Sequence, residues 1–267
     1  MHTMSTGSYK FEALNDAAFQ TERLRQQAQA VRGIEAGILR SAGILPGHDV
    51  LELGCGPGFV SDLLAELAPE GGLYVVEPSA TLLAQVAGNI RNKPARGLYP
   101  IQAYGDSLPI PDSSIDFSYA RFVLQHIPQP ETVVSEIHRI MRPGGRFCAV
   151  DSDDGLVVFY PEEQRVSQVL MAAQATQAEK GGDRFIGRKL QQMMFNAGFT
   201  NIKSRVLALT STELPFDVLF NILLGYKASL LGDAIDVKKL FADLSREVAD
   251  GRQLIAGGVF IVTGEKT

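Results

Sequence analysis

The sequence predicts an α/β protein whose core is a parallel sheet with helices on both faces. An apolar run typical of a strand, Val50–Leu53, ends in alternating glycines at Gly54, Gly56 and Gly58, and helical spacing follows over Phe59–Leu67. Further along the chain, strand-like and helix-like segments alternate, which indicates βαβ units. A strand, a glycine turn and a helix place free backbone N–H groups at one edge of the sheet. We therefore expect a nucleotide-like cofactor at that edge.

The composition is that of an ordinary globular protein of 267 residues with a formal net charge of −5. This length is sufficient for one large α/β domain with a substantial core. The acidic balance and the lack of a Lys/Arg run argue against a nucleic-acid partner.

Cysteine usage and the N-terminal residues indicate the compartment. Cys55 and Cys148 are too few for a disulfide framework and fit a reducing cytosol. No Cys/His cluster has the spacing of a metal site. Residues 1–8 lack the apolar core of a signal peptide, and no stretch is long enough to span a membrane. We expect a cytoplasmic protein without a bound metal and without a membrane partner.

Residues 1–45 precede the first strand and predict a helical cap over the cofactor edge of the sheet. Asn15-Asp16 is a plausible N-cap for a first helix. A second helix is expected over Val31–Ala42, ending at Gly43.

The second strand, Leu73–Val76, ends at Glu77. A carboxylate in this position can accept hydrogen bonds from both ribose hydroxyls of an adenosine. Because NAD enzymes use the same carboxylate, Glu77 predicts an adenosine cofactor without choosing among cofactors. The pattern then predicts a helix over Ala80–Arg91 and a strand near Pro100–Tyr104.

The rest of the α/β pattern predicts further strands and helices in alternation. Strands are expected over Ser114–Ala120, Arg146–Asp151, Asn201–Thr210 and Gly258–Thr263, and helices over Pro130–Met141, Pro161–Lys180 and Gly187–Phe195.

The core is thus expected over residues 46–212 and 252–267, with a helical insertion over residues 213–251. This insertion is longer than an ordinary connection between two strands, which indicates a structural or functional role. Its apolar residues, which follow helical spacing from Phe216 to Leu231, fit a lid over an acceptor pocket, a homodimer seam, or core packing.

The glycine spacing is G-x-G-x-G, and Phe59 stands where a dinucleotide fingerprint has its third glycine. Together with the preceding Glu52, this stretch resembles motif I of the class I S-adenosylmethionine-dependent methyltransferases. Three further stretches are similar to the enzymes of ubiquinone and menaquinone biosynthesis in this family: Gly105–Asp112, Arg121–Pro128 and Arg142–Gly145. The resemblance covers residues 45–151, with four motifs in the right order.

The resemblance implies a Rossmann-like fold, with a seven-stranded, mostly parallel sheet whose last strand is antiparallel. It implies S-adenosylmethionine as cofactor and S-adenosylhomocysteine as product. The implied activity is methyl transfer to a small acceptor such as a quinone, a phenol or another natural-product-like molecule. An NAD(P)-dependent oxidoreductase and a non-catalytic, S-adenosylmethionine-binding regulatory protein are the alternatives, and a homodimer is possible in each case.

The resemblance also implies which residues form the site. The implied cofactor-binding residues are Tyr9, Glu52, Gly54, Cys55, Gly56, Gly58, Glu77, Pro78, Asp106, Ser107, Arg121, Phe122 and Gln125. Tyr9, with Arg32, is a candidate contact for the methionine part of the cofactor, and a merely packing or solvated role is the alternative for both.

Two assignments stay open at this stage. The related enzymes have an acid shortly before Leu-Pro-Phe that bonds the adenine amino group. Here Tyr104 occupies that position, so either Asp106 or the backbone of Tyr104 and Gly105 is expected to hold the adenine. His126 follows the fourth strand and is expected either to act as general base or only to pack against the backbone.

Overall fold

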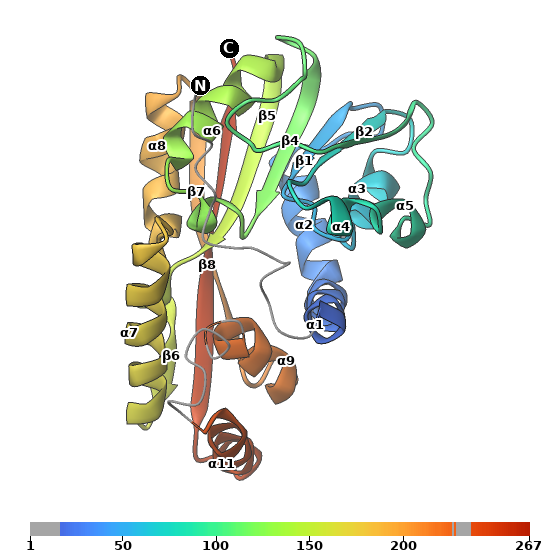
Figure 1. Cartoon of the computed structure of the whole chain (residues 1–267). Coiled ribbons are helices and arrows are strands. Elements are labelled where there is room, and N and C mark those ends of the chain that lie inside the picture. Colours follow the sequence, from blue (N-terminus) through green and yellow to red (C-terminus); the bar gives the residue numbers. More distant parts are fainter. Residues whose placement is uncertain (1–16, 226, 228–235) are drawn as a thin grey trace.

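The computed structural model describes residues 17–225, 227 and 236–267 (Figure 1). Tyr9 and the expected N-cap at Asn15-Asp16 lie outside the described residues.

The described chain forms an eight-stranded sheet, in which β3, β2, β1, β4, β5 and β8 are neighbours in that order (Figure 1). The pairs among β1 to β5 are all parallel, and β8 runs antiparallel to β5. The strands are β1 Val50–Leu53, β2 Gly72–Val76, β3 Gly97–Ile101, β4 Ile115–Arg121, β5 Met141–Ser152, β6 Val158–Tyr160, β7 Thr200–Thr210 and β8 Leu254–Glu265. The predicted Rossmann-like, mostly parallel sheet with an antiparallel last strand is confirmed.

Helices cover both faces of this sheet (Figure 1). They are α1 Ala17–Ala30, α2 Arg32–Ala42, α3 Ser61–Leu67, α4 Ala80–Leu83, α5 Val86–Asn89, α6 Pro130–Ile140, α7 Gln164–Glu179, α8 Leu190–Asn196, α9 Phe216–Phe220 and α11 Val237–Ala249.

The two predicted elements between β2 and β4 differ from the structure. The helix expected over Ala80–Arg91 consists of two one-turn helices, because the backbone N–H of Gln85 bonds to Leu82, three residues back, and so tightens the turn. The strand expected near Pro100–Tyr104 begins three residues earlier, at Gly97, and residues 102–104 belong to the loop that follows it.

Side chains alternate between the two faces along β1 and β5. Leu51 and Leu53 of β1 pack with α6 and α8 on one face, whereas Val50 packs with α2 and α3 on the other. The same alternation separates Phe147 from Cys148 in β5. Because both faces are covered, the central strands read as largely continuous apolar runs.

β8 is longer than expected and has partners along both of its edges. β7 pairs with residues 256–265 along one edge. Along the other edge β5 pairs with residues 259–265, and β6 then pairs with residues 254–256. Between β5 and β6 the chain leaves the edge of β8 and forms a 3₁₀ turn, Asp154–Leu156. The sequence did not predict β6, because three residues are too few for a recognisable alternation.

The inserted segment packs mainly against its own chain. Leu219, Phe220, Leu223, Leu240 and Leu244 are buried with residues of α7 and β8 in one apolar cluster. The apolar spacing that suggested a lid or a homodimer seam is therefore satisfied within the chain at these positions. The division into cap, core and insertion stays a prediction.

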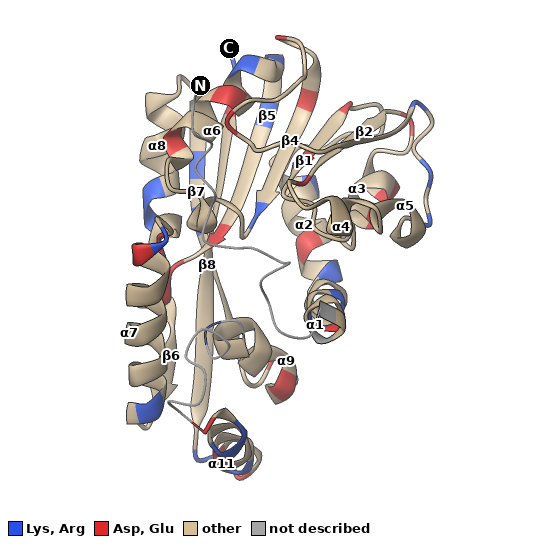
Figure 2. Cartoon of the chain, viewed as in Figure 1, with Lys and Arg blue, Asp and Glu red and all other residues tan. Residues whose placement is uncertain are grey.

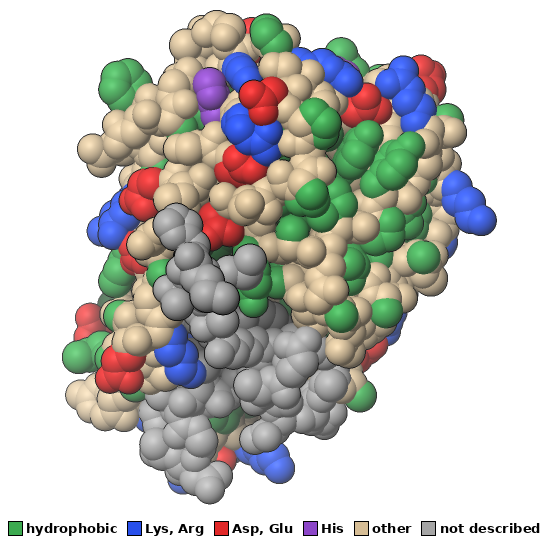
Figure 3. Space-filling model, turned by 45° about the horizontal axis from the view of Figure 1, so that its top comes forward, with side chains coloured by type: hydrophobic (Ala, Val, Ile, Leu, Met, Phe, Trp, Pro, Cys, Tyr) green, Lys and Arg blue, Asp and Glu red, His purple; other side chains and the backbone are tan. Residues whose placement is uncertain are grey.

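Charged residues of both signs are interspersed along the described elements (Figure 2). On the face shown in Figure 3, Lys and Arg likewise alternate with Asp and Glu. On that face, charge does not single out a binding patch. No helix in the described part of the chain is both long and apolar enough to cross a membrane.

Candidate functional site

A cavity of about 760 Å³ lies at the carboxyl ends of the parallel strands. The residues that directly follow β1, β2, β3, β4 and β5 all contribute to its lining. This position is the one where doubly wound sheets bind ligands, because the loops diverge where β1 and β4 lie side by side. Its volume is in the range of sites for small molecules and cofactors.

The glycine loop after β1 exposes its backbone to this cavity. Gly54, Gly56 and Gly58 all have positive φ, at 65°, 54° and 88°, which favours glycine. A Cβ added at Gly56 would meet no atom within 4 Å, so protein packing does not demand a glycine there. The open space leaves the main chain accessible to a ligand.

Gly58 serves a different purpose from the one implied by the resemblance. It is not among the residues that line the cavity. A Cβ at this position would come within 3.0 Å of the Cα of Val86 in α5, so Gly58 allows that helix to pack against the loop.

Glu77 lies at the end of β2 with its carboxylate held by the backbone. One oxygen accepts a hydrogen bond from the N–H of Gly56 at 3.1 Å, and the other accepts from the N–H of Ser79 at 3.0 Å. Glu77 and the adjacent Pro78 both line the cavity. The carboxylate is therefore fixed at the cavity wall, beside the glycine loop.

Glu52 is buried at the end of β1 and also lines the cavity. It accepts a hydrogen bond from the hydroxyl of Ser61. Burial raises the pKa of Glu52 to about 8, and the nearby carboxylates Glu35 and Glu77 add to the effect. At neutral pH the Glu52 carboxyl is therefore mostly protonated in the ligand-free protein.

This pKa predicts a proton-linked affinity for a cationic ligand. An ammonium group placed at Glu52 favours the carboxylate, so binding of S-adenosylmethionine near pH 7 should release a proton. The affinity should rise between about pH 6 and about pH 8, relative to a Glu52→Gln variant titrated in parallel. Calorimetry in buffers of different ionisation enthalpy measures the proton release. Identical pH profiles for the two proteins would contradict the prediction.

The loop after β3 forms the next part of the cavity wall. Tyr104, Gly105 and Asp106 all line the cavity, so both alternatives for the adenine contact remain geometrically available. Ser107 does not line it.

The residues at the end of β4 and directly after it are fixed by contacts that the sequence did not predict. The guanidinium of Arg121 pairs with Glu35 of α2 at 3.1 Å, and Tyr119 donates to the same carboxylate at 2.6 Å. Phe122 has a φ of 55°, an uncommon conformation for a bulky residue. Such strain persists only where the surrounding structure fixes it, and here it occurs in the cavity wall.

Gln125 follows in a 3₁₀ turn, Leu124–His126, and its amide oxygen is shared by two donors. It accepts from the guanidinium of Arg184 at 2.5 Å and from the hydroxyl of Ser152 at 2.9 Å. Gln125 therefore lines the cavity in a fixed orientation that links β4 to the loop carrying Arg184.

His126 lines the cavity with its Nδ1 3.5 Å from the amide nitrogen of Gln177. Burial lowers the pKa of His126 to about 3, and the positive charges of Arg184 and Arg23 contribute. The imidazole is therefore neutral across the physiological range. It is able to accept a proton, but only weakly.

This pKa predicts the behaviour of His126 in solution. Its ring resonances should show no titration between about pH 5 and pH 8, because burial and two neighbouring cations oppose protonation. Heteronuclear NMR with a His126→Asn variant for assignment makes the measurement. A midpoint above about pH 5 would show that the ring is not in this environment.

Comparison with known proteins shows which protein family shares these features. A family model described as a methyltransferase domain matches residues 51–149. This segment contains the glycine loop, Glu77, the loop after β3 and the residues after β4. The chain carries a class I S-adenosylmethionine-dependent methyltransferase domain. The cofactor of this domain is S-adenosylmethionine.

Named relatives of this methyltransferase domain include the demethylmenaquinone methyltransferase of Geobacillus stearothermophilus. The two are 32% identical over 112 residues, which cover 40% of this chain and 47% of the relative. An uncharacterised 37.1 kDa protein in a transposon of Streptomyces fradiae is 32% identical over 174 residues, covering 64% of this chain and 48% of that protein. The chain thus spans about half the length of these curated relatives.

The fold of the methyltransferase domain matches solved structures as well. One is phosphoethanolamine N-methyltransferase 2 from Haemonchus contortus, solved with phosphomonomethylethanolamine and S-adenosylhomocysteine. The TM-score is 0.56 at 17% identity, and the match covers 86% of this chain and 52% of the other.

Most of the predicted site residues line this cavity. They are Glu52, Gly54, Cys55, Gly56, Glu77, Pro78, Asp106, Arg121, Phe122, Gln125 and His126. Arg32 is placed elsewhere, since it pairs with Glu66 of α3 at 2.7 Å and does not line the cavity.

Sequence reasoning missed the polar residues on the far side of the cavity. Asp154, Arg184 and Lys227 line it but lie outside residues 51–149, which the family model matches. The acidic run Asp151–Asp154 directly after a predicted strand was the one available signal.

Proposed function

We propose that this protein is a methyltransferase that moves a methyl group from S-adenosylmethionine to a small-molecule acceptor. The observation that carries the proposal is the fixed Glu77 carboxylate beside an open glycine loop, at the carboxyl edge of the sheet.

The residues around the cavity fit S-adenosylmethionine in their chemistry. Glu77 would accept hydrogen bonds from the two ribose hydroxyls, and Glu52 would pair with the methionine ammonium. The backbone of Gly54 and Gly56 allows close approach of the ligand. Asp106, or the backbone of Tyr104 and Gly105, would bind the adenine edge.

When bound, S-adenosylmethionine supplies a methyl group on a sulfonium, and an electron pair of the acceptor displaces S-adenosylhomocysteine in line. Because this leaving group is already good, the protein has chiefly to align the acceptor and exclude water. Arg121, Phe122 and Gln125 form a fixed wall for that alignment.

An acceptor that carries a proton on its reacting oxygen or nitrogen must lose it. The neutral imidazole of His126 would accept this proton directly or through a water, as general base. Since its pKa is lowered to about 3, it suits an acceptor whose proton is already acidic.

The relatives favour a quinone or phenol-like acceptor, because a demethylmenaquinone methyltransferase is among them. The apolar side chains Leu219, Ile222 and Leu223 in the cavity wall fit a molecule with an apolar body. A homodimer stays a prediction, which light scattering of the purified protein tests.

Calorimetric titration with S-adenosylmethionine, S-adenosylhomocysteine and NAD tests the proposal. We expect both adenosyl ligands to bind and NAD not to bind, because Phe59 stands where a dinucleotide site needs a glycine. Transfer of labelled methyl to a panel of phenols and quinones then tests the acceptor class. Binding of NAD without either adenosyl ligand would overturn the proposal in favour of hydride transfer.

A further inference from the structure

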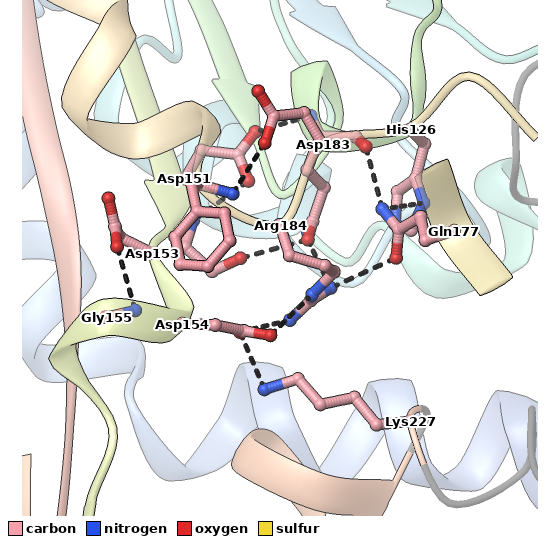
Figure 4. A network of polar contacts seen from close by, with 12 residues as sticks. His126, Asp151, Asp153, Asp154, Gly155, Gln177, Asp183, Arg184 and Lys227 are labelled. Atoms are coloured by element: carbon pink, nitrogen blue, oxygen red, sulfur yellow. Dashed lines mark hydrogen bonds and ion pairs between the residues drawn. The ribbon is translucent and has the colours of Figure 1, made fainter. Parts of the chain in front are cut away.

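A buried cluster of three charged residues forms the wall of the cavity beside Gln125 (Figure 4). Asp154 lies in the 3₁₀ turn after β5, Arg184 in the loop after α7, and Lys227 in the inserted segment after α9. Their relative exposures are 5%, 8% and 3%. Three separate segments therefore bring charge to one buried place.

Asp154 lies between the two cations (Figure 4). Its carboxylate accepts from two nitrogens of Arg184, at 3.0 and 3.2 Å, and from the ammonium of Lys227 at 2.8 Å. A third nitrogen of Arg184 donates to the oxygens of Gln125 at 2.5 Å and Gln177 at 3.5 Å. The guanidinium is thus engaged on both sides by protein acceptors.

Within the described part of the chain, Lys227 has donor capacity left over. An ammonium carries three N–H donors, and Asp154 is the partner that the structure gives it among the described residues. The ammonium is buried, so bulk water does not readily serve the remaining donors. These donors are at the cavity wall, where a ligand can reach them.

The cluster has one positive charge in excess. Arg184 and Lys227 contribute two positive charges and Asp154 one negative charge. The neighbouring acids do not fully redress this balance. Asp153 is paired with Arg188 at 2.6 Å, and burial raises the pKa of Asp151 to about 7, so that Asp151 is only partly ionised at neutral pH. An uncompensated charge in a buried place is costly, so the cavity wall favours an anion.

Charged residues of the cavity wall form two groups. Glu52, Glu77 and Asp106 belong to the part assigned to the cofactor, and Arg121 beside them is paired with Glu35. Arg184 and Lys227, with Asp154 between them, belong to the other group. The remaining wall is apolar and includes Leu207, Leu209, Leu219, Ile222, Leu223 and Val259.

We propose that the acceptor is an apolar acid, and that Lys227 binds its carboxylate directly while Arg184 and Asp154 position the ammonium. This inference rests on the methyltransferase function proposed above and narrows its acceptor class. A single carboxylate brings the cluster of three residues to neutrality. A dianionic phosphate would instead leave a negative excess.

Binding to the unmodified protein, saturated with S-adenosylhomocysteine, is the first test. The probes are matched pairs that differ in charge: decanoate against methyl decanoate, and 3-phenylpropionate against 3-phenylpropionamide. We expect each acid to bind roughly tenfold or more tightly than its neutral partner near pH 7, the range for a hydrogen bond that involves charged groups. Equal affinities within both pairs would overturn the inference.

Variants then test the role of Lys227. Lys227→Met keeps the length of the side chain and removes the charge, and it should abolish the preference for the acids. Lys227→Arg should retain it, and so should Lys239→Met on the exposed surface of α11. An undiminished preference in Lys227→Met would show that the ion pairs are structural only and would overturn the assignment.

Affinity for S-adenosylhomocysteine separates this inference from the proposed function. We expect that affinity to be unchanged in Lys227→Met, which also shows that the variant is folded. If the unmodified protein binds S-adenosylhomocysteine but does not prefer the acids, only the present inference fails. If it does not bind S-adenosylhomocysteine, the methyltransferase proposal fails first.

Discussion

An Asp154→Asn substitution should lower the free energy of unfolding by about 3–5 kcal/mol. The carboxylate is buried and accepts hydrogen bonds from both Arg184 and Lys227. Its neutralisation leaves two buried cations close together without a counter-charge. Removing one partner of a buried ion pair is among the few single changes with so large an effect.

The loss should depend on pH in a defined direction. Burial by itself would raise the pKa of Asp154, but the charges of Lys227 and Arg184 outweigh it and hold the pKa below its ordinary value. A lowered carboxyl pKa contributes stability that is present above the unfolded value and is lost as pH falls through the folded value. The difference between the two proteins should therefore be full near pH 7 and shrink below about pH 4.

Urea denaturation at several pH values measures this difference. Asp112→Asn is a suitable control, because Asp112 is exposed and its pair with Arg139 lies at the surface, where an ion pair is worth at most about 1 kcal/mol. In Asp154→Asn combined with Lys227→Met, part of the stability should return, since one of the two unpaired cations is removed. Equal stabilities of Asp154→Asn and the unmodified protein at pH 7 would show that the cluster is not charged as described.

A Glu77→Gln substitution should weaken the binding of S-adenosylmethionine and S-adenosylhomocysteine by about ten- to a hundredfold. This is the range of about 1.5–3 kcal/mol for hydrogen bonds to a charged group. The amide keeps the shape of the side chain but has one acceptor oxygen in place of two, and no charge. Two ribose hydroxyls and the N–H groups of Gly56 and Ser79 then compete for it.

Calorimetric titration measures this effect, with Glu66→Gln as the control. Glu66 is exposed on α3 and pairs with Arg32, away from the cavity, so its replacement should leave the affinity unchanged. Thermal melting of the ligand-free Glu77→Gln protein shows whether the glycine loop is intact. An unchanged affinity in a well-folded variant would mean that Glu77 does not contact the ribose.

Local sequence patterns were sufficient to predict the parallel half of the sheet and its cofactor edge. The strand, the alternating glycines and the following helix indicated the cofactor edge, and the acid after β2 was placed at the same edge by topology alone. The carboxyl ends of parallel strands necessarily meet, so residues such as Glu52, Glu77 and Gln125 could be assigned to one cavity without a structure.

Features that depend on long-range contacts were not accessible in this way. The three-residue β6 pairs with residues 254–256 at the start of β8, which lie far along the chain. Gly58 resembled a ligand contact in the sequence, yet its neighbour in space is Val86.

The α/β class, the glycine loop at the cofactor edge and the family resemblance are all encoded in short, contiguous segments, so the sequence was sufficient to predict them. Only the tertiary structure brought together Asp154, Arg184 and Lys227, which are separated by 30 and 43 residues along the chain. It also decided the pKa values of Glu52 and His126. Burial and the distances between charges set those values, and neither is a property of a local sequence.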